Sequence, residues 1–320
     1  MQNHRNTWSL VLAAGDGSRL RTLTTTDSGI AIPKQFCSLR SGSSLLHRTL
    51  DRARSLSSKS EICVVVAAEH RCWWLPQLDS LPESNIIVQP LNRGTANGIL
   101  LPLLILHRRD PGANIVILPS DHHVREELIL ARSMRQALDE VQKDTEDIVL
   151  LGIEPEEPDP QLGYIVPGNP DDQVKRPVMR FVEKPTVVEA RELIGQGALW
   201  NAFIVVSSTH ALLTLFSRRV PDIVNAMQAA IGYDLESSGA ARAVAKLYRR
   251  LPTSDFSCDI LTGQSSYLRV LPVRRCGWND LGTPDRVARA LRLCAEQADD
   301  GLPVGSSHLS LEAQHRRLFG

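Results

Sequence analysis

Short runs of consecutive apolar residues alternate with longer segments of helical periodicity through the first half of the chain. The apolar runs predict strands at Ser9–Ala13, Ile62–Ala67, Ile86–Val88, Ile115–Leu118 and Ile148–Ile153. The periodic segments predict helices at Leu45–Leu56, Thr95–Arg109 and Arg125–Gln142. Strands that are apolar along their whole length are typical of a parallel sheet covered on both faces. With right-handed crossovers, this order predicts an α/β fold with a doubly wound, mostly parallel, Rossmann-like sheet.

The second half mixes shorter strands with helices, without a Pro/Gly-rich linker. It predicts strands at Tyr164–Val166, Val178–Val182, Asn201–Ser207 and Tyr267–Val273. Helices are expected at Glu189–Gly195, as two or three segments across Ala211–Arg250, and at Pro284–Gln297. We therefore expect one large domain at 1–298 with a smaller substrate-facing lobe. A short polar C-terminal tail at 299–320 is expected to pack loosely or to contact another subunit of a homo-oligomer.

Composition narrows the class of protein. The 320 residues include 36 basic and 36 acidic side chains, and this balance argues against non-specific binding of nucleic acid or anionic membranes. No uninterrupted apolar stretch is long enough to predict a transmembrane helix, and the N-terminus lacks a signal-peptide layout. The 6 cysteines are scattered without a CxxC pair, so they are interpreted as reduced thiols, Cys276 included. We expect a cytoplasmic protein.

The segment VLAAGDGSRLRTLTTTDSGIAIPKQF, residues 11–36, follows the first predicted strand. Gly15 and Gly17 would let main-chain N–H groups approach a phosphate closely. Arg19 as a fork and Lys34 as a point charge could then hold the anion from two sides. An ordinary turn whose glycines serve the backbone conformation alone is the alternative. The inserted piece Thr24–Ile32 is either a mobile lid over a nucleotide or an inert insertion.

Two carboxylates follow later apolar strands. Asp121 in LPSDHHV comes directly after the strand Ile115–Leu118, and Asp280 lies in GWNDLGT. Mg²⁺ favours one or two carboxylates together with phosphate oxygens, so these residues are candidate metal ligands if the fold brings them together. A helix cap near Arg125 is the alternative for Asp121. His122 and His123 are expected to be loop or packing residues, because Mg²⁺ prefers oxygen ligands.

Other polar residues follow the strands as well. In VQPLNRGTANGI, the Gln89 amide suits a base edge and Gly94 would let a base lie on the backbone, whereas Thr95 competes as a helix cap. In FVEKP, Glu183 could accept sugar hydroxyls while Lys184 meets a phosphate, or the two could form a solvated charge pair. Asn201 in WNAF is either a sugar ligand or a structural amide.

Taken in order, AAGDGSRL…PKQF, QPLNRGTA, PSDHH, GYI, VEKP, WNAF and GWNDLGT resemble the motifs of the sugar-1-phosphate nucleotidyltransferases, over about residues 9 to 290. PKQF, RGTA and GWND favour the branch that uses GTP and mannose 1-phosphate over the thymidylyl and uridylyl branches. The resemblance implies that Arg19 and Lys34 stabilise the reacting phosphates and that Asp121 and Asp280 bind Mg²⁺.

The resemblance also assigns roles around the two substrates. The nucleotide would be bound by the first loop and the base-reading loop, at Ala13, Ala14, Gly15, Gly17, Gln89, Gly94 and Thr95. The sugar phosphate would be bound by Gly163, Glu183, Lys184 and Asn201, with Lys184 also counted as catalytic. We expect the reaction of GTP with mannose 1-phosphate to give GDP-mannose and pyrophosphate by in-line attack on the α-phosphorus.

Several residues depart from the family pattern. Gly94 stands where Asn is usual, Asn97 where Pro is common, WNAF replaces WNSG, and the loop between Leu23 and Pro33 is longer. Longer bifunctional relatives carry a C-terminal isomerase domain, which we do not expect in a chain of this length. The alternatives are the same chemistry with another nucleotide or hexose 1-phosphate, and a non-catalytic nucleotide-sugar-binding regulatory subunit. A dehydrogenase is disfavoured because Leu20 breaks the GxGxxG spacing.

Overall fold

Each apolar run of the first half forms a strand of one sheet. The computed structural model describes residues 6–26, 28–39, 42–169, 174–232 and 238–299. Its first strands are β1 (Thr7–Ala13), β2 (Ile62–Ala67), β3 (Ile86–Gln89), β4 (Asn114–Pro119) and β5 (Ile148–Ile153). β1 pairs in parallel with β2 and β4, and β2 pairs in parallel with β3. The predicted parallel half-sheet is confirmed.

The second half completes the sheet with β6 (Gly163–Pro167), β7 (Arg176–Glu183), β8 (Leu199–Ser208) and β9 (Leu268–Val273). The nine strands lie in the order β3-β2-β1-β4-β8-β5-β9-β7-β6, with a further pairing between β8 and β6. β8 runs antiparallel to β4 and β5, and β7 runs antiparallel to β9 and β6. Most of the strands therefore point the same way, with β7 and β8 reversed.

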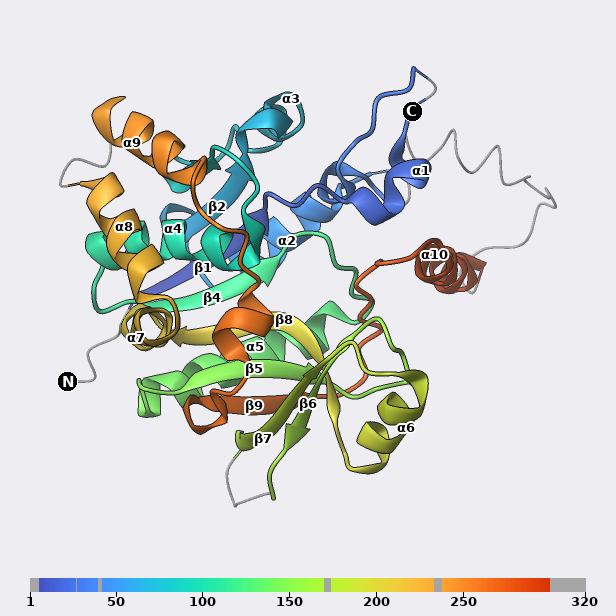
Figure 1. Ribbon diagram of the computed structural model, residues 1–320. Coiled ribbons are helices and arrows are strands. Elements are labelled where there is room, and N and C mark those ends of the chain that lie inside the picture. Colours follow the sequence, from blue (N-terminus) through green and yellow to red (C-terminus); the bar gives the residue numbers. More distant parts are fainter. Residues whose placement is uncertain (1–5, 27, 40–41, 170–173, 233–237, 300–320) are drawn as a thin grey trace.

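Helices cover both faces of this sheet (Figure 1). They are α1 (Arg21–Thr24), α2 (Leu45–Arg54), α3 (Arg71–Trp74), α4 (Gly94–Arg109), α5 (Glu127–Lys143), α6 (Val187–Gly195), α7 (Thr209–Arg219), α8 (Pro221–Ile231), α9 (Ser238–Tyr248) and α10 (Pro284–Asp299). The hairpin of β6 and β7 lies with α6 at one end of the molecule and forms the smaller lobe (Figure 1). In the described part of the chain, no helix combines the length and apolar character that a membrane span requires.

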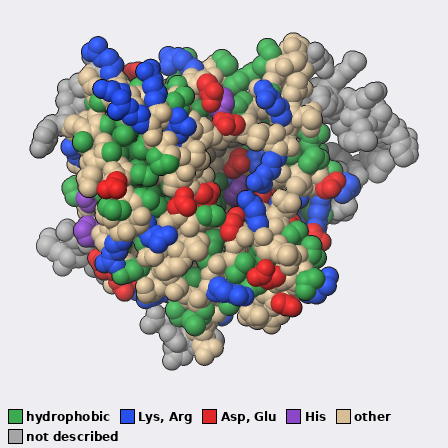
Figure 2. All heavy atoms as spheres, in the orientation of Figure 1, with side chains coloured by type: hydrophobic (Ala, Val, Ile, Leu, Met, Phe, Trp, Pro, Cys, Tyr) green, Lys and Arg blue, Asp and Glu red, His purple; other side chains and the backbone are tan. Residues whose placement is uncertain are grey.

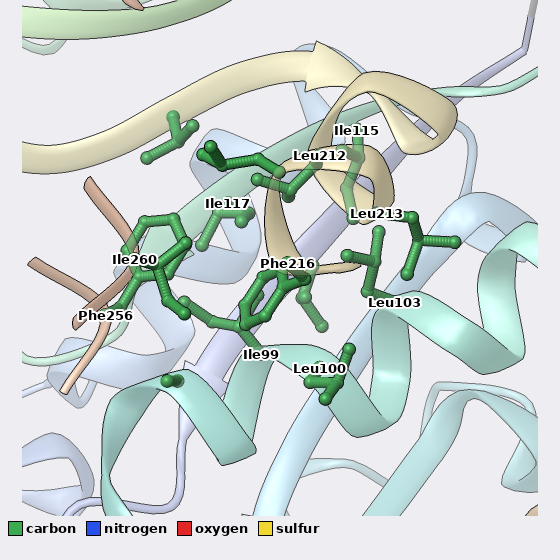
Figure 3. Packing of buried hydrophobic residues seen from close by; sticks show 14 of the residues in the cluster. Ile99, Leu100, Leu103, Ile115, Ile117, Leu212, Leu213, Phe216, Phe256 and Ile260 are labelled. Atoms are coloured by element: carbon green, nitrogen blue, oxygen red, sulfur yellow. The ribbon is translucent and has the colours of Figure 1, made fainter. Parts of the chain in front are cut away.

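Alternate side chains of the central strands belong to two different cores. Leu10 of β1 packs in the core beneath α4, α7 and α8, whereas its neighbour Val11 packs in the core beneath α2 and α5. Successive side chains of a strand point to opposite faces, so a strand buried on both sides must be apolar throughout. Figure 3 shows the first core, where Ile99 of α4, Ile117 of β4 and Phe216 of α7 lie close together. This double burial confirms the doubly wound fold.

Some element boundaries differ from the prediction. α5 begins at Glu127 and not at Arg125, because the main-chain N–H groups of Arg125 and Glu126 donate to the carbonyl of Cys276. The segment Ala211–Arg250 contains three helices, of which α9 follows residues outside the described ranges. A π-helix at Phe256–Leu261 was not predicted. The predicted tail at 299–320 lies, apart from Asp299, outside the described residues.

Candidate functional site

A cleft of about 440 Å³ lies at the carboxyl ends of β1, β3 and β4 and extends to β6, β7 and β8. Figure 2 shows this face hollowed near its middle, with acidic and histidine side chains deep inside and basic side chains along the rim. Most of the predicted site residues line it: Ala14, Gly15, Gly17, Arg19, Gln89, Gly94, Thr95, Asp121, Gly163, Glu183, Lys184, Asn201 and Asp280. Ala13 and Lys34 do not line the cleft, since both side chains are buried behind it.

Contacts with Lys34 and Gln35 fix the conformation of the loop after β1. Gly17 has φ 60°, and a Cβ there would lie 2.9 Å from the main-chain nitrogen of Lys34. The Gln35 side-chain amide donates to the carbonyls of Ala13 and Gly15. These contacts leave Arg19 exposed at the cleft, without an ion-pair partner among the described residues. The loop can therefore present main-chain N–H groups and one cation to an anionic ligand.

Lys34 connects the two predicted metal ligands from behind. Its Nζ lies 2.8 Å from Asp121 Oδ2 and donates to the main-chain carbonyl of Asp280 at 2.6 Å. Burial alone would raise the pKa of Asp121, but the neighbouring ammonium group brings this pKa below its usual range. Asp121 thus stays ionised. Its alternative role as a helix cap is wrong, because α5 begins six positions later and no side chain caps it.

Asp280 is held by a residue that the sequence did not single out. Arg286 on α10 contacts both Asp280 and Asp159, and Asp280 also accepts from the main-chain nitrogen of Gly282. These three side chains are only 13% to 19% exposed. The Asp159–Arg286 contact depends on tertiary structure, and the only sequence signal for Arg286 was its place in the first turn of the predicted helix after GWNDLGT. Arg286 offsets the charge of Asp280 and fixes one of its carboxylate oxygens.

The two histidines after Asp121 lie where its loop meets the Asp280 loop, and His122 also lines the cleft. His122 lies edge-on to Trp278, with ring centroids 5.2 Å apart, and burial lowers its pKa. The main chain of His123 pairs with that of Asn279 in an isolated antiparallel bridge. Burial and three nearby arginines lower the pKa of His123 to about 4. Both rings therefore stay neutral near pH 7, and the bridge joins the Asp121 loop to the Asp280 loop.

The proposed base end of the cleft joins two distant segments. Gly94 has φ 82°, and a Cβ there would lie 2.2 Å from the main-chain oxygen of Ser254. Thr95 donates its hydroxyl to Asp255 and accepts from the main-chain nitrogen of Phe256. Thr95 is therefore not a helix cap. Asp255 and Ser257 line the cleft as well, although nothing in the sequence marked them beyond a polar stretch before an apolar run.

The VEKP and WNAF residues line another part of the cleft wall. A Cβ at Gly163 would lie 2.6 Å from Glu183 Oε2, so the glycine leaves room for this carboxylate. Burial raises the pKa of Glu183, Lys184 opposes this shift, and Asp255 adds to it. Lys184 Nζ lies 3.8 Å from Glu183 Oε1 and is 49% exposed. Asn201 uses its oxygen to accept from the main-chain nitrogen of Phe203, which leaves its amino group facing the cleft.

A separate group of possible metal ligands lies beside the first loop. One ligand atom each from Asp16, Glu69 and His70 lies within 4.8 Å of the others. The Asp16 and Glu69 side chains are exposed, and Asn92 already donates to Asp16. Exposed acidic groups of this kind are common without a metal. The pair Asp121 and Asp280, which lines the cleft, is the better placed candidate.

Comparison with known proteins identifies relatives over most of the chain. The family model described as nucleotidyl transferase matches residues 8–297. A mannose-1-phosphate guanylyltransferase of Escherichia coli is 30% identical over 285 residues, which are 85% of this chain and 59% of the relative. A relative of the same name from Klebsiella pneumoniae is 29% identical over 280 residues, 86% of this chain and 58% of its own. The chain thus spans less than two thirds of the length of these curated relatives.

A solved structure shares the fold. The crystal structure named mannose-1-phosphate geranyltransferase from Thermus thermophilus is 25% identical, with a TM-score of 0.73, and the match covers 87% of this chain and 76% of that one. The matched family model covers almost the whole described chain, from β1 to α10. The chain belongs to the nucleotidyl transferase family.

Proposed function

We propose that this chain transfers the nucleotidyl group of GTP to mannose 1-phosphate, giving GDP-mannose and pyrophosphate. One observation supports this most: a single cleft is lined by the loop after β1, by the carboxylates of Asp121 and Asp280, and by the VEKP and WNAF residues. Such a cleft can hold a triphosphate and a sugar phosphate side by side. The names of the relatives support the choice of substrates.

In the proposed reaction, an oxygen of the sugar phosphate attacks the α-phosphorus of the nucleotide. A new P–O bond forms there, and the bond to the β-phosphate oxygen breaks, so pyrophosphate leaves with the electron pair. A phosphate monoester has a second pKa of about 6, so the attacking oxygen is already ionised at neutral pH. No general base is required, and catalysis depends on positioning and on charge neutralisation.

The residues of the cleft supply these two effects. Arg19 would contact the triphosphate from the exposed rim, and Lys184 would hold the incoming phosphate from the opposite end. Lys34 would act mainly from behind, since its ammonium group fixes Asp121 and the main chain of Asp280. Glu183 and the amino group of Asn201 would bind sugar hydroxyls.

We propose Mg²⁺ as the cofactor. The donor set fits, because Mg²⁺ prefers carboxylate oxygens completed by phosphate oxygens, and Asp121 is kept ionised by Lys34. Lys34 occupies one oxygen of Asp121 and Arg286 one oxygen of Asp280, so each carboxylate retains an oxygen for a cation. Asp121 and Asp280 would hold the ion, which when bound would supply positive charge to offset that of the nucleotide phosphates.

The geometry of Gln89 supports guanine as the base. Its amino group donates to the carbonyl of Leu91 at 2.7 Å, which orients the amide. Its Oε1 is buried and has no hydrogen-bond partner among the described residues, and Gln89 lines the cleft. An unpartnered carbonyl acceptor suits a base edge with N–H donors, such as the amino and N1–H groups of guanine.

A pyrophosphate-release assay tests the proposal over a grid of GTP, UTP, dTTP and ATP against mannose 1-phosphate and glucose 1-phosphate. We expect GTP with mannose 1-phosphate to give the highest kcat/KM, and excess EDTA to abolish it. Preference for another pair would correct the substrates. Tight binding of GDP-mannose without pyrophosphate release would instead identify a regulatory subunit.

We propose the cytoplasm as the location, where the described free cysteines stay reduced.

A further inference from the structure

Phe203 has an unusual backbone conformation for an aromatic residue. Its φ is 56°, a left-handed value that glycine adopts freely and that a side chain with a Cβ disfavours. It lies in β8 where the register with β5 shifts, since Leu150 faces Val205 but Gly152 faces Asn201. Such irregularities re-aim side chains next to functional sites. The position corresponds to the glycine of the WNSG pattern. A bulky ring therefore occupies a position whose backbone conformation favours a residue without a side chain.

The ring is supported on one side by the core. It lies edge-on to Phe256, with centroids 5.9 Å apart and planes at 65°. Phe256 is fully buried, and Figure 3 shows it beside Ile260 in the packed core below α7. The Phe203 side chain is itself only half-buried, because it also lines the cleft. One part of an anchored aromatic ring thus remains open to a ligand.

Polar groups line the same cleft as this open part of the ring. Asn201 is fixed against the main chain of Phe203, since its Oδ1 accepts from the Phe203 nitrogen at 3.0 Å. Glu183 and Asp255 line the same cleft, and the charge of Asp255 adds to the raised pKa of Glu183. A hexose offers apolar C–H faces between edges of hydroxyl groups. An anchored ring beside two carboxylates and an amide matches both properties, as in pockets where apolar walls carry a few polar groups.

We propose that the Phe203 ring is the surface on which the sugar ring of the substrate stacks, so that Phe203 is a specificity-determining residue for the hexose. The proposal rests on the function proposed above. It also gives the strained aromatic residue in β8 a role: packing against Phe256 helps to hold the left-handed backbone, and the ring lines the cleft.

The test compares the binding of GDP-mannose and GDP by isothermal titration calorimetry in wild-type protein, Phe203→Ala and Phe203→Gly. We expect the Kd of GDP-mannose to rise about tenfold in both variants, in the range of a lost aromatic contact. The Kd of GDP should change by less than about twofold, which also shows that the variants are folded. Met179→Ala, on the exposed side of β7, is the control and should change neither value.

Thermal unfolding of the same variants tests the backbone argument. Phe203→Gly should melt no lower than Phe203→Ala, the reverse of the usual order in a strand, because only glycine is unstrained at this φ. A higher melting temperature for the alanine variant would overturn the argument from strain.

The binding data separate the remaining outcomes. If the wild type binds GDP-mannose more tightly than GDP and Phe203→Ala keeps this preference, the role of Phe203 is overturned and the proposed function stands. An equal loss of both ligands would assign the ring to the nucleotide and overturn the sugar contact. Wild-type protein that binds GDP-mannose no better than GDP would overturn the proposed function as well.

Discussion

The Lys34 ammonium group lies 2.8 Å from Asp121 Oδ2 while it donates to the main-chain carbonyl of Asp280. One side chain from the loop after β1 therefore holds together the loops that follow β4 and β9. Its position is also protected, because the Lys34 side chain is only 9% exposed. The ionisation of Asp121 and the main-chain position of Asp280 both depend on this contact.

We predict that Lys34→Ala lowers kcat/KM for pyrophosphate release by about 10²-fold or more, the scale of a lost electrostatic donor. Without the ammonium group, burial raises the pKa of Asp121, so on acidification the variant should lose activity at a higher pH than the wild type. Steady-state assays from weakly acidic to weakly alkaline pH measure both effects. Lys59→Ala removes an exposed lysine outside the cleft and should be neutral. A folded Lys34→Ala protein with wild-type activity would contradict this prediction.

Arg286→Met should lower the free energy of unfolding by about 3 kcal/mol, because it leaves Asp159 and Asp280 together without their shared cation. Urea unfolding measures the change. Arg289→Met, one turn further along α10, removes a more exposed arginine and should cost less than about 1 kcal/mol. Adding Asp159→Asn to Arg286→Met should recover part of the loss. Equal losses of unfolding free energy in Arg286→Met and Arg289→Met would contradict the prediction that the contacts of Arg286 with Asp159 and Asp280 stabilise the fold more than an exposed ion pair does.

Gly94→Ala should destabilise the protein by about 2 kcal/mol or more, since a Cβ at φ 82° is disfavoured and would meet the main-chain oxygen of Ser254 at 2.2 Å. GTP affinity should fall with it, because the start of α4 must move. Gly195→Ala is the matched control: a Cβ there meets nothing within 4 Å, so the change should stay within about 0.5 kcal/mol. Thermal melts and GTP titrations give both values, and equal effects of the two substitutions would count against this close packing.

Glu183 should impose a pH dependence on sugar binding. Its pKa is raised above the ordinary 4.5, chiefly by burial, so it becomes protonated at higher pH than a surface glutamate. The KM for mannose 1-phosphate should therefore rise as the pH falls through this raised pKa. Glu183→Gln should show a high KM without that pH dependence, whereas Glu192→Gln, on the exposed side of α6, should behave as the wild type.

The same shift has a consequence for stability. The folded protein binds the Glu183 proton more tightly than the unfolded chain does, so stability falls as pH rises from the ordinary to the raised pKa. Above this window, Glu183→Gln should be more stable than the wild type. Urea midpoints of Glu183→Gln and wild type, measured near the ordinary glutamate pKa and again at weakly alkaline pH, test this sign. If Glu183→Gln is less stable than the wild type at the higher pH, the predicted sign is wrong.

The first half of the fold could be predicted because its strands are buried on both faces. Such strands are apolar throughout, and the runs at Ile62–Ala67 and Ile148–Ile153 match β2 and β5 at both ends. The direction of β8 could not be predicted in this way. Its apolar run is equally compatible with a parallel neighbour, and only its pairing with β4 and β5 reverses it.

Site residues were predictable where a polar side chain comes directly after a predicted strand, as Asp121 does after β4. The residues that hold such groups were not predictable, since their contacts join distant segments. Arg286 reaches Asp159 across the fold, and Asp255 meets Thr95 only because the segment before the π-helix returns to the start of α4. For Phe203, the sequence showed the departure from the WNSG motif, but only the structure shows that its backbone is left-handed.

The reversed strand β8 has one more consequence. β8 pairs with β4 over Val205–Ser208, whereas its start pairs with β5 and β6, so one strand joins the parallel half of the sheet to the smaller lobe. This connection is made by main-chain hydrogen bonds and does not depend on two domains closing on each other. The two substrates would therefore meet on a rigid frame, and we expect the motion that accompanies turnover to be confined to the loops around it.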